Sequence, residues 1–127
     1  MTPARCILII DDSRLIRQVA EMTLGQRGWK ILTAQDGQQG IAIATSELPD
    51  AILLDVVMPD PDGPETLIRL RRDPRTAGIP VVFLTGLADS EQARTALSGL
   101  GADGLLSKPF DPETFAEVVA GALRWSE

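Results

Sequence analysis

Histidine is absent from this sequence of 127 residues, and cysteine occurs once, at Cys6. Without histidine the chain cannot build a Ser-His-Asp or Cys-His catalytic pair, and it lacks the usual ligand of zinc and haem sites. A single cysteine excludes a disulfide framework and a cysteine-based zinc site. Because Cys6 lies inside an apolar run, we expect it to be a small core residue. Any chemistry must therefore use carboxylates, hydroxyls and lysine.

Aromatic residues and basic charge are also scarce. Aromatics make up 4% of the chain and tyrosine is absent, so aliphatic side chains must fill the interior. The formal charge is −6, from 18 acidic and 12 basic residues, which argues against a nucleic-acid or anionic-membrane surface. No apolar stretch approaches the ~18 residues of a membrane span, and no export signal precedes the first apolar run. We therefore expect a cytoplasmic protein.

The remaining composition fits one globular domain over residues 1–127, with 44% hydrophobic and 24% charged residues. Short apolar runs alternate with segments of helical periodicity, without repeats or linkers. This alternation predicts an α/β fold with a parallel sheet and helices on both faces. The expected strands are 5–11, 29–34, 51–58, 79–86 and 103–108, and the expected helices are 13–28, 36–48, 64–73, 89–101 and 111–125.

The last helix has the strongest start signals. Asp111 is predicted to be its N-cap and Pro112 its first helical residue. Phe110 and Phe115 are spaced to pack against each other across that cap.

Charged or hydroxyl residues follow four of the five predicted strands. They are Asp11 and Asp12, Asp55, Thr85 and Lys108. Taken singly, each has an ordinary explanation: a helix cap, a turn, a strand threonine, a solvated lysine. Because the carboxyl ends of parallel strands meet at one edge of the sheet, we expect all of them to share one cleft.

Three aspartates in one cleft require compensation. At ~5 Å, each pair repels by roughly 3 kcal/mol if the effective dielectric constant is near 20. Lys108 offsets one charge, and the oxygen ligands suit Mg²⁺ rather than zinc. Asp55, on the most apolar and so most central strand, is the best candidate for a nucleophile that forms an aspartyl phosphate. The cleft therefore predicts phosphoryl transfer.

The stretches "IIDDS", "LLDVVMPDPDG", "FLTG" and "GADGLLSKPF" occur in an order and spacing that resemble the receiver domain of bacterial two-component response regulators. The resemblance covers essentially the whole chain. It implies a doubly wound, flavodoxin-like (βα)5 fold with five parallel strands in the order 2-1-3-4-5.

The resemblance also implies residue roles. Asp55 would accept a phosphoryl group from a sensor histidine kinase or a histidine phosphotransfer protein. Mg²⁺ would be bound directly by Asp12, Asp55 and the backbone carbonyl of Val57, while Asp11 would act mostly through water. Gly63 would help to shape the loop after the phosphorylation site.

The remaining implied roles concern the phosphorylated state. Lys108 would pair with the phosphoryl group, Thr85 would donate its hydroxyl to it, and a cis peptide bond before Pro109 would aim the lysine inward. Where the family usually has a tyrosine or phenylalanine that turns inward on activation, this sequence has Leu105. That part of the family's readout therefore does not transfer.

Three functions remain open at this point. The leading one is a phosphorylatable receiver, a monomer or weak dimer that meets a kinase and a downstream protein and catalyses only its own phosphorylation and dephosphorylation. The second is a scaffold that binds partners regardless of phosphorylation, which the leucine at position 105 favours. The third is a small aspartate-nucleophile phosphatase, although the adjacent Asp11-Asp12 pair differs from the D-x-D pattern of such enzymes. The opening Met1 favours a whole protein over an excised fragment.

Overall fold

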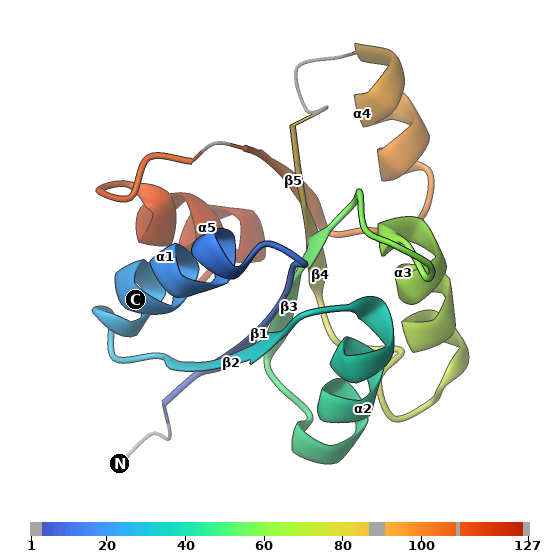
Figure 1. The fold of residues 1–127 in the computed structure, drawn as a ribbon, viewed down its shortest axis with the longest axis horizontal. Coiled ribbons are helices and arrows are strands. Elements are labelled where there is room, and N and C mark those ends of the chain that lie inside the picture. Colours follow the sequence, from blue (N-terminus) through green and yellow to red (C-terminus); the bar gives the residue numbers. More distant parts are fainter. Residues whose placement is uncertain (1–3, 87–90, 109, 126–127) are drawn as a thin grey trace.

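The central feature of the computed structural model, which describes residues 4–86, 91–108 and 110–125, is a sheet of five parallel strands. The strand order is β2-β1-β3-β4-β5, as the resemblance implied (Figure 1). The strands are β1 (Cys6–Ile10), β2 (Lys30–Ala34), β3 (Ala51–Asp55), β4 (Val81–Thr85) and β5 (Gly104–Ser107).

One helix follows each strand, and the helices cover both faces of the sheet. In Figure 1, α1 and α5 lie on one side, and α2, α3 and α4 lie on the other. None of the helices in the described part of the chain is long and apolar enough to cross a membrane. The helices are α1 (Arg14–Gly25), α2 (Gly37–Glu47), α3 (Gly63–Arg72), α4 (Glu91–Ser98) and α5 (Phe115–Leu123).

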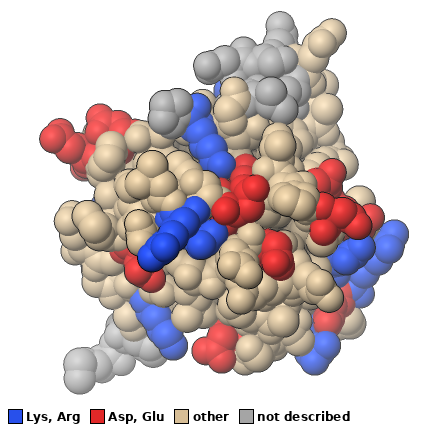
Figure 2. All heavy atoms as spheres, viewed as in Figure 1, with Lys and Arg blue, Asp and Glu red and all other residues tan. Residues whose placement is uncertain are grey.

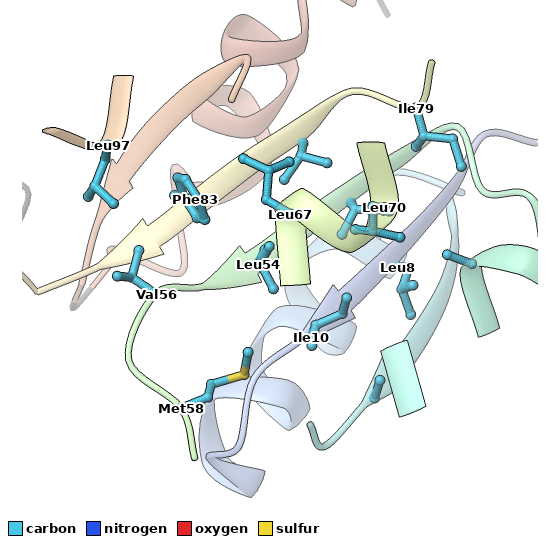
Figure 3. Close-up of a cluster of buried hydrophobic side chains, with 14 residues drawn as sticks. Leu8, Ile10, Leu54, Val56, Met58, Leu67, Leu70, Ile79, Phe83 and Leu97 are labelled. Carbon is cyan, nitrogen blue, oxygen red and sulfur yellow. The ribbon is translucent and has the colours of Figure 1, made fainter. Parts of the chain in front are cut away.

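Alternate residues of the central strands supply two cores. The core between the sheet and α2, α3 and α4 contains Leu54 of β3 and Phe83 of β4 in its middle (Figure 3). The core under α1 and α5 contains the intervening residues Leu53 and Val82. Because both faces are covered, every residue of β3 and β4 is buried, which explains their nearly unbroken apolar sequences.

Close packing against neighbouring elements explains the two glycines of α2. A Cβ atom on Gly40 would collide with the side chain of Ile10 on β1, and one on Gly37 would collide with Thr66 on α3. The glycines therefore let α2 approach both neighbours, and Gly40, inside the helix, costs roughly 1 kcal/mol in helix propensity.

The start of α5 differs from the prediction. The helix begins at Phe115 with Thr114 as its N-cap, and residues 112–114 form a turn instead of a first helical turn. Asp111 does act as a cap, but of this turn: its Oδ1 accepts a hydrogen bond from Glu113 N at 2.9 Å. Asp111 therefore caps a turn that precedes the helix, and not α5 itself. The expected aromatic contact is present, since the rings of Phe110 and Phe115 stack with centroids 3.7 Å apart.

Candidate functional site

The parallel register brings the carboxyl ends of the strands to one edge. Ile10 pairs with Leu54 across β1 and β3, and Thr85 pairs with Ser107 across β4 and β5. The residues that follow these positions therefore lie side by side. Figure 2 shows acidic side chains gathered near the middle of one face, with basic side chains around them.

Lys108 joins two strands through its ammonium group. Its Nζ lies 2.7 Å from Asp11 Oδ2 and 3.0 Å from Asp55 Oδ1. The backbone of Lys108 is fixed to the end of β4, because its N–H donates a hydrogen bond to Thr85 O at 3.0 Å. With the side chain of Lys108 only 20% exposed, the two carboxylates provide the partners that a partly buried cation requires.

The three aspartates form one cluster. Asp11, Asp12 and Asp55 each have one carboxylate oxygen within 4.8 Å of those of the other two. Asp11 and Asp55 are buried, whereas Asp12 is exposed at the mouth of the site. The structure thus brings together Asp11, Asp12 and Asp55, with Lys108 in contact with two of them, as the positions of the strand ends predicted.

The cluster offers carboxylate oxygens of the kind that bind a hard cation. Asp11 Oδ1 accepts a hydrogen bond from Ser13 N at 2.9 Å. Asp11 Oδ2 is buried and has no hydrogen bond of acceptable geometry within the described structure, although Lys108 is its ion-pair partner at 2.7 Å. An oxygen-only donor set with net negative charge and one exposed carboxylate fits Mg²⁺, which keeps several water ligands. The residues present therefore fit the metal that the sequence predicts.

The pKa of Asp55 reflects mainly its burial, and then its charged neighbours. Burial first, and then the charge of Asp11, raise the pKa of Asp55 from 3.8 to about 6, against the opposing effect of the Lys108 hydrogen bond. Burial would lower the pKa of Lys108, but its contacts with Asp11 and Asp55 raise that pKa above the ordinary value. The lysine therefore stays charged at neutral pH.

The other predicted residues lie around this cluster. Thr85 is 1% exposed at the end of β4, next to the backbone of Lys108. The side chain of Val57 points to solvent, with 66% exposed, which is compatible with a role for its backbone alone. Leu105 is half-buried and packs against the core under α2, α3 and α4. The predicted cis bond before Pro109 falls outside the described residues, whereas the Asp60–Pro61 bond, which the sequence did not single out, is cis.

Two neighbours of the site were not foreseen in these roles. Arg17, one turn into α1, donates from Nη1 to the backbone oxygen of Asp11 at 2.8 Å. Gly63 packs its Cα against the end of β3, where a Cβ atom would collide with Asp55 O and lie 2.7 Å from Val56 Cα. Neither contact can be predicted from residue types. Arg17 contacts a backbone oxygen, and Gly63 approaches the backbone of β3 because it has no side chain.

Gly63→Ala is expected to lower the free energy of unfolding by about 2 kcal/mol, because the added methyl group must displace backbone beside Asp55. Urea unfolding would measure the loss. The control is Gly25→Ala at the end of α1, where no atom lies within 4 Å of the added Cβ. If both variants lose the same stability, the close approach of Gly63 to β3 is not the cause.

Comparisons with known proteins agree on one family. The model of the response regulator receiver domain matches residues 7–120. The DNA-binding dual master transcriptional regulator RpaA of Synechocystis sp. is 42% identical over 120 residues, which cover 93% of this chain and 48% of that protein. Protein PilH of Pseudomonas aeruginosa is 35% identical over 117 residues, which cover 92% of this chain and 96% of that protein.

Comparison with solved structures also finds response regulators. The chemotaxis protein CheY4 of Vibrio cholerae superimposes with a TM-score of 0.87 and 32% identity, over 94% of this chain and 99% of that one. A putative response regulator from Chloroflexus aurantiacus superimposes with a TM-score of 0.85 and 30% identity, over 96% and 99%. The chain spans about half the length of RpaA and of other transcriptional regulators that it matches.

Proposed function

This chain belongs to the response regulator receiver domain family, and from that premise we propose that it is a single receiver domain over residues 1–127 that accepts a phosphoryl group on Asp55. The donor is a phosphohistidine of a sensor histidine kinase or a histidine phosphotransfer protein, in the cytoplasm. The observation that supports this proposal most directly is the contact of one lysine with two buried carboxylates, 2.7 and 3.0 Å away, beside a third carboxylate at the mouth of the site.

In the proposed reaction a carboxylate oxygen of Asp55 attacks the phosphorus. An O–P bond forms, the P–N bond to the donor histidine breaks, and the imidazole leaves with the electron pair and takes up a proton. Asp55 must be ionised for this attack. Its pKa of about 6 allows ionisation at neutral pH while keeping the carboxylate less stabilised than an exposed one.

The surrounding residues stabilise the charge that develops on the phosphoryl oxygens. Asp12, Asp55 and the backbone carbonyl of Val57 would hold Mg²⁺, with Asp11 acting through water, and the bound ion would supply electrophilic stabilisation. Lys108 supplies a positive charge that is already in place, and Thr85 supplies a hydroxyl donor. The chain therefore acts on its own side chain and does not turn over a separate substrate.

The test uses acetyl phosphate as a small donor in place of the kinase. Incubation with acetyl phosphate and Mg²⁺ should add the mass of one phosphoryl group to the intact protein, and peptide mapping after borohydride reduction of the acyl phosphate should place it at residue 55. Chelation of Mg²⁺ should prevent the addition. No mass change at saturating donor, or modification at another aspartate, would refute the proposal.

A second candidate function is a scaffold that binds its partner without phosphorylation. The observation in its favour is Leu105, an aliphatic residue already packed against the core, where the sequence resemblance leads one to expect an aromatic ring that changes position. The two functions are separated by the affinity for the downstream protein with and without beryllofluoride, a phosphoryl mimic. Equal affinities would favour the scaffold.

The output of the proposed switch depends on the protein context. RpaA is described as DNA-binding, and this chain covers only about half of it. PilH is covered over nearly its whole length. We propose a protein target for this domain and no direct contact with nucleic acid, because its net charge of −6 opposes binding to phosphates.

A further inference from the structure

Arg17 contacts the loop that carries two of the three aspartates. Arg17 is half-buried, and its Nη1 donates to the backbone oxygen of Asp11 at 2.8 Å. That oxygen belongs to the peptide group that joins Asp11 to Asp12. A hydrogen bond to it therefore fixes the plane from which the chain continues into Asp12.

Hydrogen bonds also hold this loop at both ends, where β1 finishes and where α1 begins. Asp11 N donates to Ala34 O of β2 at 3.1 Å, and Asp11 Oδ1 accepts from Ser13 N. Ser13 caps α1, where its Oγ accepts from Ile16 N at 3.3 Å. Between these anchors, Arg17 of α1 donates a hydrogen bond to the Asp11–Asp12 peptide. Asp12 is exposed, so its orientation depends on the backbone on which it stands.

We infer that Arg17 is a positioning residue for the cation site: it holds the Asp11–Asp12 peptide so that the carboxylate of Asp12 stays aimed at Asp55. This inference rests on the proposed binding of Mg²⁺ by the cluster. Arg17 does not touch the metal or the phosphoryl group, and it acts only through the backbone oxygen of Asp11. Groups that orient metal ligands commonly change metal affinity by roughly ten- to a hundredfold when they are removed.

The charge of Arg17 and its positioning role predict opposite effects on Mg²⁺ affinity when the residue is removed. A positive charge near the cluster repels Mg²⁺, so the removal of Arg17 by charge alone should strengthen Mg²⁺ binding. If the hydrogen bond orients Asp12, the removal of Arg17 should weaken binding in spite of the lost repulsion. Arg14 separates the two effects, because it lies on the same turn of α1, is exposed, and carries the same charge.

The experiment measures the Mg²⁺ dissociation constant of the intact chain by calorimetric titration, at a temperature where circular dichroism shows every variant folded. Arg17→Gln should bind Mg²⁺ about tenfold more weakly than the unsubstituted chain. Arg14→Gln should bind with unchanged or slightly higher affinity. Arg17→Lys keeps the charge and one donor and should recover part of the loss, which also covers the case in which Arg17→Gln fails to fold.

The Mg²⁺ titrations distinguish a failure of the positioning role of Arg17 from a failure of the proposed function. If the unsubstituted chain binds no Mg²⁺, the proposed function itself fails. If it binds Mg²⁺ and Arg17→Gln binds equally well or more tightly, the positioning role is overturned while the proposed function stands. A general loss of stability without a change in Mg²⁺ affinity also overturns it.

Discussion

Asp55→Asn is expected to abolish phosphoryl incorporation from acetyl phosphate and, at the same time, to stabilise the metal-free protein by about 1–3 kcal/mol at neutral pH. The loss of labelling follows because an amide has no ionised oxygen to attack phosphorus. The gain in stability follows because the asparagine is uncharged, and Asp55 is ionised in an environment that disfavours its charge. Its pKa of about 6 lies about two pKa units above the ordinary 3.8, and each unit corresponds to about 1.4 kcal/mol.

The effect on stability should depend on pH with a definite sign. Between pH ~4 and pH ~6 the folded chain keeps the proton on Asp55, whereas the unfolded chain loses it. Stability from this group therefore falls as pH rises through that window and is at its lowest above pH ~6. The amide that replaces the carboxyl group does not titrate, so the advantage of the variant should be near zero at pH ~4 and complete above pH ~6.

Urea unfolding of both proteins across this range, with a chelator present, measures the difference. Asp73→Asn is the control. Arg75 lowers the pKa of the Asp73 carboxyl, so removing that carboxyl should cost stability above pH ~4 instead of adding it. Added Mg²⁺ should stabilise the unsubstituted protein more than the Asp55→Asn variant and so reduce the gap between them. A stability difference that does not change with pH would contradict the raised pKa of Asp55.

The architecture was predictable because the pattern that encodes it is long-range and repeated. Five apolar runs alternating with helical segments leave few topologies open, and parallel strands necessarily bring their carboxyl ends to one edge. The meeting of Asp11, Asp12, Asp55 and Lys108 follows from that rule alone. The roles of these residues stay predictions, which the labelling and binding experiments address.

The features that the sequence did not predict depend on local competition or on backbone atoms. The predicted start of α5 lies three residues too early because Asp111 can cap a turn as well as a helix, and composition does not choose between them. The contact of Arg17 with Asp11 O could not be read from residue types, because every residue has a backbone oxygen. The two glycines of α2 resemble weaknesses in the sequence, and only the structure places Ile10 and Thr66 against them.

Lys108→Met is expected to destabilise the metal-free protein by about 3 kcal/mol at pH 8. The methionine keeps most of the apolar stem but removes the charge that pairs with Asp11 and Asp55, and both carboxylates are buried. Below pH ~6 the loss should shrink, since Asp55 can take up a proton in place of the missing partner. Unfolding by urea at pH 8 and pH 5 measures both values.

The control is Arg69→Met, which removes a cation from an exposed pair with Glu65 at 3.5 Å on α3. Such pairs contribute about 0.5 kcal/mol or less, so this variant should be nearly neutral. The stricter test is the combination of Lys108→Met with Asp55→Asn. If the lysine stabilises the fold by offsetting the charge of Asp55, the double variant should be more stable than Lys108→Met alone, and the two effects should not add in the way that independent sites do. Simple additivity would mean that the stabilisation by Lys108 does not depend on the charge of Asp55, and the account of the site as one coupled set of charges would be wrong.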